Sequence, residues 1–493
     1  MANIRFRYTG LTAYMASLIT MLTGLAFTLL ITRRLTPAEL GVWRYVGTLI
    51  SYFVAPAAFI GFWATRMTAQ GKTILGTTMM LATLFSSLAT LLFITFSNIF
   101  ASSVDFPATV FLMAALEIPA IYVYTVLEST ATAIRPHTNY YASIIQEVVK
   151  LPIGIILVLL LRLGLSGALL AAVVGFASRA TAMALFLRDV KWGSPDKSTA
   201  VNILSKAWLP LYSSIPPSIG ALDAVIIVIL YRTAEPLGYL SAVNLIGSIV
   251  TASGNLAAAL YPRMLQSPSH KDVEASLRLV FMSAIPTATG ALILSQNLLN
   301  LLRPEYVGAA TLIPLALIQA MIFIVNSIFD SVIIGGERAD FGEETDIRKI
   351  LKSRLFLLPT INYLSSALYL ATLVTVLYLI SPTDLFEILF LWLSISAASA
   401  LGLTVYKLRL ARKNMKFILP FHSFIRYLTA SIVMGLVLLV LRPSSLPKEI
   451  INALSQTLIP VVIGAATYFV SLYPLDKEFR DMVKTILRTL GLL

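Results

Sequence analysis

Stretches of about 20 mainly apolar residues recur along the whole chain, and each is long enough to cross a hydrocarbon core roughly 30 Å thick as a helix. We count fourteen of them among the 493 residues. The segments between them are short, so no soluble domain fits. The predicted spans are 10–32, 41–63, 75–100, 106–130, 140–161, 163–187, 207–231, 237–261, 278–301, 308–334, 355–380, 384–406, 423–441 and 452–473.

The composition excludes several other classes of protein. Hydrophobic residues make up 58% of the chain and charged residues 12%, whereas a soluble domain has about 25% charged residues. Cysteine is absent, so a disulfide scaffold is excluded. His137, His270 and His422 fall in or near different loops, which argues against a metal site or a catalytic triad. We expect no cofactor and no enzymatic activity.

The basic residues fix the predicted orientation. Segments on the side of the N-terminus hold 28 of the 37 Lys and Arg residues, and segments on the other side hold 8. Because cytoplasmic loops carry the excess of Lys and Arg, both termini are predicted to be cytoplasmic, in a multi-pass protein of the cell membrane. Lys150 is the one basic residue assigned inside a span. The net charge of +13 therefore faces anionic lipid, and no nucleic-acid partner is expected.

The sequence repeats itself at an offset of 197 residues. Gly41 then falls on Gly238, and Arg66 falls on Arg263. Further along, the offset grows to about 207, which an insertion near 336–346 would explain. Six spans per repeat is an even number, so both copies enter the membrane from the same side and are related by a pseudo-two-fold axis along the membrane normal.

The predicted fold is an all-α polytopic membrane protein with about fourteen transmembrane helices. Residues 1–200 and 201–416 form two parallel six-helix bundles, and 417–493 add two transmembrane helices and an amphipathic tail around 476–493. Two such bundles facing each other are typical of a transporter that works by alternating access.

Several motifs in order resemble a known family. They are Thr-Gly-Leu-Thr-Ala-Tyr at 9–14, Arg-Arg-Leu-Thr-Pro-Ala-Glu-Leu-Gly-Val-Trp at 33–43, Trp-Leu-Pro-Leu-Tyr at 208–212, Pro-Leu-Gly-Tyr-Leu-Ser-Ala at 236–242, Tyr-Pro-Arg-Met at 261–264 and Arg-Pro-Glu-Tyr-Val-Gly-Ala-Ala at 303–310. The chain resembles the Wzx-type polysaccharide flippases of the multidrug/oligosaccharidyl-lipid/polysaccharide (MOP) exporter superfamily.

This resemblance implies a function and partners. A member of the family flips a polyprenyl-linked oligosaccharide from the cytoplasmic to the outer leaflet, for the assembly of surface polysaccharide or of glycoprotein glycans. The implied substrate is an oligosaccharide on polyprenyl pyrophosphate or polyprenyl phosphate. Membrane lipids and glycan assembly enzymes are the other partners implied.

Ionisable residues inside the spans are the candidates for a transport cavity, because each is costly in lipid unless it faces a cavity or a partner. They are Glu117, Glu147, Lys150 and Asp223. Glu147 and Lys150 are three residues apart, so they either neutralise each other or leave Lys150 to contact a pyrophosphate. Glu117, before Pro119, and Asp223, after Pro216 and Pro217, stand near helix breaks, where they are either functional or structural.

Other charged residues stand at the predicted ends of the spans. Arg33, Arg34 and Arg44 form a candidate outer mouth for an anionic headgroup; the alternative is that they snorkel to lipid phosphates. Arg66, Arg263 and Asp330 form a candidate cytoplasmic gate. For the two arginines, the alternative is a simple anchoring role at the helix ends.

Two further functions remain open. One is an ion-coupled exporter of drugs or small cations from the same superfamily, which the acidic residues inside the bundle favour. The other is a membrane glycosyltransferase or polysaccharide polymerase, which the short outer loops disfavour. The chain lacks a nucleotide-binding loop, since Gly71-Lys72-Thr73 is without the preceding glycine. Coupling to Na⁺ or H⁺ through Glu117, Glu147 or Asp223 remains open.

Overall fold

The structure is a computed structural model that describes residues 6–258, 260–266, 269–335, 353–443, 446–447 and 449–489. Helices account for all the regular secondary structure within these ranges. The insertion predicted near 336–346 lies outside them. The chain divides into two compact units, residues 1–238 and 239–493. The bundle boundaries predicted after 200 and 416 stay a prediction.

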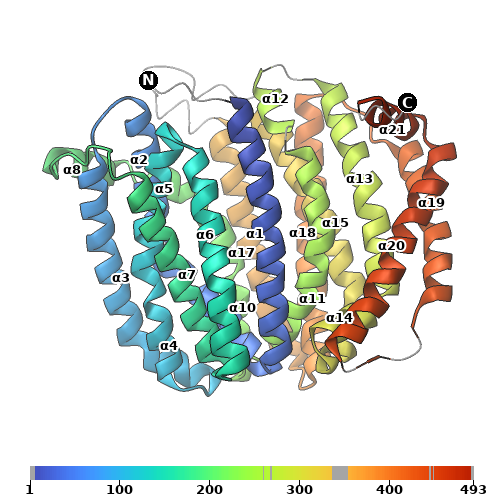
Figure 1. Cartoon of the computed structure of the whole chain (residues 1–493), viewed down its shortest axis with the longest axis horizontal. Helices are drawn as coiled ribbons and strands as arrows, with labels where there is room; N and C mark the ends of the chain where they lie inside the picture. The colour runs from blue at the N-terminus through green and yellow to red at the C-terminus, as the bar shows by residue number, and fades with distance from the viewer. Residues whose placement is uncertain are drawn as a thin grey trace. The chain divides into compact units, whose positions relative to one another are not determined.

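Unit 1 contains long helices and two interrupted ones (Figure 1). In chain order its helices are α1 (Phe6–Arg34), α2 (Pro37–Ala69), α3 (Leu75–Val104), α4 (Ala108–Ala115), α5 (Glu117–Ile134), α6 (His137–Gly154) with a π-helical end (Ile155–Leu160), α7 (Gly164–Phe186), α8 (Lys197–Ser205), α9 (Trp208–Gly220), α10 (Leu222–Tyr231) and the start of α11 (Glu235–Thr251).

Unit 2 holds the rest of the chain. After α11 and a 3-10 turn (Ala252–Ala257) come α12 (Leu260–Gln266), α13 (His270–Ile293), α14 (Ser295–Leu302), a second 3-10 segment (Pro304–Leu312), α15 (Ile313–Gly335), α17 (Arg354–Ile380), α18 (Leu385–Asn414), α19 (Phe421–Leu441), α20 (Ile450–Leu475) and α21 (Lys477–Thr489).

The predicted all-α membrane fold is confirmed. Thirteen helical stretches of the described chain are long and apolar enough to cross a membrane, and α1 covers the first predicted span. They are Pro37–Ala69, Leu75–Val104, Ala108–Ile134, His137–Leu160, Gly164–Phe186, Pro210–Tyr231, Glu235–Ala257, His270–Ile293, Pro304–Gly335, Phe356–Ile380, Leu385–Lys413, Phe421–Leu441 and Ile451–Leu475.

Two spans of unit 1 are interrupted, both next to proline. The fourth span breaks at Leu116, between α4 and α5, because Pro119 has no N–H to donate to the carbonyl four residues earlier. The seventh span breaks at Ala221, between α9 and α10, a few residues after Pro216 and Pro217. The hydroxyl of Tyr52 in α2 donates to the Ser218 carbonyl at this break, at 2.8 Å, which replaces the helical partner that the break removes.

The repeat detected in the sequence is visible in the local structure of unit 1. Thr36 caps the start of α2 by accepting from the Glu39 N–H, and Thr233 accepts from the Glu235 N–H at the start of α11. The two helix starts also touch reciprocally. A Cβ on Gly41 would overlap the Ala234 carbonyl, and a Cβ on Gly238 would overlap the carbonyl of Pro37. At the offset of 197, Pro37 matches Ala234.

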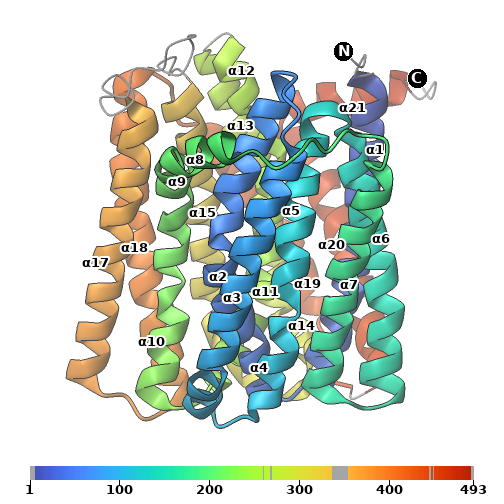
Figure 2. The same cartoon turned by 90° about the vertical axis from the view of Figure 1, so that its left-hand side faces the viewer.

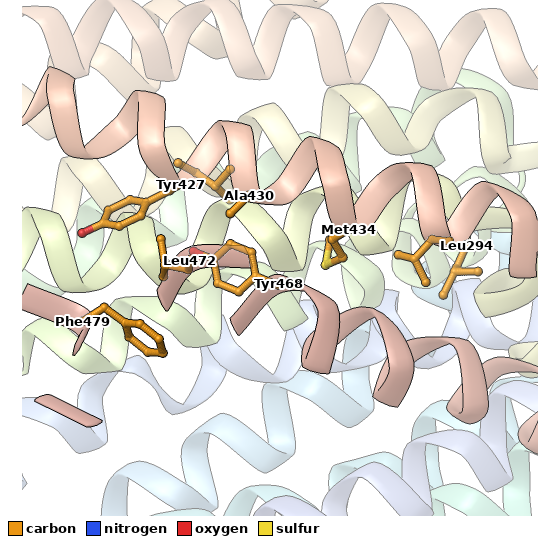
Figure 3. Close-up of a cluster of buried hydrophobic side chains, with 9 residues drawn as sticks. Leu294, Tyr427, Ala430, Met434, Tyr468, Leu472 and Phe479 are labelled. Atoms are coloured by element: carbon orange, nitrogen blue, oxygen red, sulfur yellow. The ribbon is translucent and has the colours of Figure 1, made fainter. Parts of the chain in front are cut away.

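The C-terminal helices close unit 2 through a buried apolar cluster. Figure 3 shows residues of α19 and α20 facing one another, with Phe479 of α21 at one end. Asp476 caps α21 by accepting from the Phe479 N–H at 2.9 Å, and Arg426 of α19 lies 3.4 Å from the same carboxylate. The predicted amphipathic tail is therefore a helix, but its Phe479 is buried against α20 instead of facing lipid.

We predict that Gly41→Ala lowers the thermal stability of the protein, because the added methyl group meets the backbone of the α11 start. Overpacking of this kind costs about 1–3 kcal/mol. Gly47→Ala, in the same helix, is the control, since a Cβ there meets nothing within 4 Å. Thermal unfolding in detergent should show a lower midpoint for Gly41→Ala, and an unchanged or higher one for Gly47→Ala. Equal midpoints would contradict the close contact.

Candidate functional site

Several ionisable side chains lie inside the spans of unit 1 and contact one another across helices. Arg179 of α7 forms a bidentate pair with Glu128 of α5, with Nη2 at 2.7 and 2.9 Å from the two carboxylate oxygens. Its other terminal nitrogen donates to Gln146 of α6 at 2.9 Å. The guanidinium also lies over the Tyr124 ring, 4.6 Å from the centroid. Arg179 thus binds α5, α6 and α7 together.

The predicted pair on α6 is formed. Lys150 Nζ lies 2.5 Å from Glu147 Oε1 and 4.9 Å from the centroid of the Phe27 ring in α1. The second oxygen of Glu147 is buried and has no hydrogen-bond partner among the described residues. Gly24 of α1 leaves room beside it, since a Cβ there would be 3.7 Å from this oxygen. The lysine is therefore neutralised, while one carboxylate oxygen is left without a hydrogen-bond partner among the described residues.

Glu117 and Asp223 occupy equivalent positions in the two interrupted spans. Each lies in the first turn of the second half-helix, Glu117 in α5 and Asp223 in α10. The N-terminus of a helix favours a negative charge, and the Asp223 carboxylate accepts from the Ala224 N–H at 2.6 Å. Glu117 is buried and makes no ion pair with any described residue.

The candidate outer-mouth residues lie close together along the chain, at the turn between α1 and α2. Arg33 and Arg34 end α1, with Arg33 half-buried and Arg34 exposed. Arg44 lies two turns into α2 and is half-buried. These positions fit either a headgroup contact or lipid phosphates, so the predicted role stays a prediction.

The candidate gate residues have separate partners. Arg66, at the end of α2, lies over the Phe62 ring at 5.0 Å, and Arg263 in α12 forms an ion pair with Asp272 at 3.2 Å. Asp330 of α15 forms an ion pair with Lys407 of α18, with nitrogen and oxygen 2.7 Å apart. The described structure does not test whether these residues gate transport.

Two basic residues lie inside helices where the sequence does not predict them. Counting charges along the sequence assigns Arg179 and Lys407 to the cytoplasmic segments and leaves Lys150 as the one basic residue inside a span. Arg179 instead lies seven residues before the end of α7, and Lys407 in α18 is 1% exposed. Together with Lys150, these bases pair with three acids of the helices, Glu147, Glu128 and Asp330.

The two missed bases belong to the same pattern. In unit 1 a base on the sixth predicted span, in α7, pairs with an acid near the end of the fourth, in α5. In unit 2 a base on the twelfth span, in α18, pairs with an acid near the end of the tenth, in α15. Glu128 lies six residues before the end of its helix and Asp330 five. The feature of the sequence that indicates these pairs is a base in one span and an acid in another, each a similar number of residues from the end of its helix.

Comparison with solved structures defines the class of fold. No protein-family model and no curated protein matches the sequence. The chain has the fold of transporters of the MOP superfamily. It is similar to the lipid II flippase MurJ in an inward closed conformation, with a TM-score of 0.67 and 12% identity over 96% of this chain and 99% of that chain. It is also similar to an inward-facing multidrug resistance MATE family transporter of the MOP superfamily, with a TM-score of 0.56 and 13% identity over 80% of this chain and 96% of that one.

We predict that Glu128 and Arg179 stabilise unit 1 cooperatively. A double-mutant cycle with Glu128→Gln and Arg179→Gln, measured by unfolding in detergent, should give a coupling free energy of about 1–3 kcal/mol, because each single change leaves a poorly solvated charge. The exposed pair Arg135–Asp189 is the control, with an expected coupling below about 1 kcal/mol. Equal coupling for the two pairs would show that the inner pair is solvated.

Proposed function

We propose that the protein is a transporter that flips a polyprenyl-linked oligosaccharide from the cytoplasmic to the outer leaflet by alternating access. The substrate class is an oligosaccharide on polyprenyl phosphate or pyrophosphate, used in the assembly of surface polysaccharide or of glycoprotein glycans. In this proposal the protein is a cell-membrane protein with both termini in the cytoplasm, and it works beside glycan assembly enzymes.

The observation that carries the proposal is the set of ionisable side chains inside the spans of unit 1, in a chain with this fold. A headgroup of sugars and phosphates cannot cross about 30 Å of hydrocarbon without polar groups along its path. Lys150, Arg179, Gln146 and Tyr124 are the kinds of donor and ring that contact phosphates and sugars. The similarity to a structure titled lipid II flippase supports the same direction.

The pairing of the bases bears on how an anionic headgroup would bind. Lys150 and Arg179 each already hold a carboxylate, so a phosphate must compete with Glu147 or Glu128. Protonation of the carboxylate, or a cation bound to it, would release the base for the headgroup. This exchange is one physical route by which H⁺ or Na⁺ could be coupled to flipping, and Glu147, with its unpartnered oxygen, is the proposed coupling residue.

The second candidate is an ion-coupled exporter of drugs or small cations. It is favoured by the acidic residues inside the bundle and by Glu117, which is buried without an ion pair among the described residues. The similarity to a multidrug resistance transporter supports it as well. A membrane glycosyltransferase or polymerase is not supported by either structural comparison.

We predict that Lys150→Ala slows flipping of a fluorescent lipid-linked oligosaccharide in proteoliposomes by about tenfold or more, the change expected when a charge-assisted contact worth about 1.5–3 kcal/mol is lost. The loop variant Lys72→Ala is the control and should keep the wild-type rate, since Lys72 is exposed between α2 and α3.

The double variant Glu147→Gln with Lys150→Ala separates the two interpretations of this pair. It removes both charges and so avoids leaving a buried carboxylate alone. If Lys150 contacts the substrate, the folded double variant should remain slow. Recovery of the wild-type rate would show that the pair only neutralises itself and would contradict the proposed contact.

We predict that Glu117→Gln reduces binding of cationic dyes by about tenfold if the protein is a cation exporter, and leaves it unchanged if it is a flippase. The proposal expects no change in dye binding and no loss of oligosaccharide flipping greater than twofold, on the order of the experimental error. A large loss of dye affinity would favour the exporter.

A further inference from the structure

The linker between α7 and α9, residues 187–207, is hydrogen-bonded to the first turn of α3. The Gly76 N–H donates to the Trp192 carbonyl at 2.5 Å, and the Asp196 N–H donates to the Thr77 hydroxyl at 3.0 Å. Gly193 allows this approach, because its φ of +69° and the Thr73 carbonyl beside it leave no room for a side chain. The linker therefore holds α8 at a defined place on unit 1. In Figure 2, α8 runs across the ends of the membrane helices, not along them.

The helix α8 has two apolar faces, of which unit 1 covers one. Ala200 and Ile203 are buried against the unit. Val201 and Leu204 are 56% and 42% exposed, and Trp208, four residues further on, is 40% exposed. Val201 and Leu204, three residues apart, share one face of α8 and form an apolar stripe there. Trp208 follows a two-residue turn as the first residue of α9. Trp192, 44% exposed, is a further aromatic residue in the linker.

The charge around this stripe is basic. Residues 187–208 contain four basic residues, Arg188, Lys191, Lys197 and Lys206, and two acids. Both acids are engaged. The side chains and backbone of Thr199 and Ser198 hydrogen-bond to Asp196 and hold the pKa of its carboxyl well below the usual value, and Arg135 does the same for Asp189. Arg188, Lys191 and Lys197 are exposed, and Lys197 is the first residue of α8.

We propose that Trp192, the exposed stripe of α8 (Val201 and Leu204) and Trp208 at the start of α9 form a membrane-interface surface whose partner is the anionic phospholipid of the adjacent leaflet. Tryptophan is enriched at the membrane interface, and a basic amphipathic helix lies in the interface plane with its apolar face among the acyl chains. Lysine and arginine beside it attract anionic headgroups. A second protein would also cover an apolar stripe, but α8 leads within a two-residue turn into α9, whose residues from Pro210 on belong to a candidate membrane span, and this places lipid nearby.

This surface gives the linker between the two sequence repeats a function of its own. In alternating access the repeats change orientation while the linker joins them. Lipid bound at α8 would hold the linker, and with it the first turn of α3, at the membrane surface. The inference does not depend on which substrate the protein carries.

The absence of cysteine from the chain allows a direct test on the full-length protein. Val201→Cys and Leu204→Cys are labelled with bimane in nanodiscs of phosphatidylcholine, with or without phosphatidylglycerol. Asn202→Cys, exposed on another face of α8, is the matched control. We expect blue-shifted emission and quenching by doxyl-labelled lipid at 201 and 204, stronger with phosphatidylglycerol, and quenching by iodide at 202. The change Lys191→Gln with Lys197→Gln should remove the effect of phosphatidylglycerol.

Two results would overturn the proposal. Quenching by iodide at 201 and 204, as strong as at 202 in both lipids, would show that the stripe faces water or a soluble partner. Equal quenching by doxyl lipid with and without phosphatidylglycerol would exclude anionic headgroups as the partner. All these positions are exposed, so loss of folding does not complicate either result.

Discussion

The cost of placing a charge in hydrocarbon governs the arrangement of the ionisable residues of this protein. An isolated charge at mid-membrane costs at least about 2.5–3.5 kcal/mol, and Lys150, Arg179 and Lys407 each have a carboxylate beside them. Two of these pairs join different helices of the same unit, α5 to α7 and α15 to α18. The pairs thereby link these helices within each unit.

The acids outside these pairs follow a second physical rule. Glu117 and Asp223 occupy the first turns of half-helices, where the helix dipole favours a negative charge. Prolines create these half-helices by removing backbone donors. Together the pairs and the half-helices distribute polar groups through unit 1 at a tolerable cost, and this distribution is the physical basis of the proposed passage for a polar headgroup.

Much of this fold is predictable from sequence, because a membrane span needs only a local run of apolar residues. Apolar runs predict the fourteen spans. Proline predicts the breaks near Pro119 and Pro217, and the fixed offset of 197 residues predicts that the segments around Gly41 and Gly238 match. Arg179 and Lys407 are not predicted inside helices, because charge counting assigns a base near a helix end to the loop, and only the neighbouring helix shows that it is buried. The burial of Phe479 likewise depends on α20, which amphipathic spacing alone does not reveal.

The central claim concerns what crosses the membrane, and transport by the wild-type protein tests it most directly. Purified protein in proteoliposomes is supplied in parallel with a fluorescent polyprenyl-pyrophosphate oligosaccharide and with a cationic drug, under the same imposed Na⁺ and H⁺ gradients. The account predicts protein-dependent appearance of the oligosaccharide in the opposite leaflet and drug movement equal to that of empty liposomes. Gradient-driven drug movement without oligosaccharide flipping would contradict it.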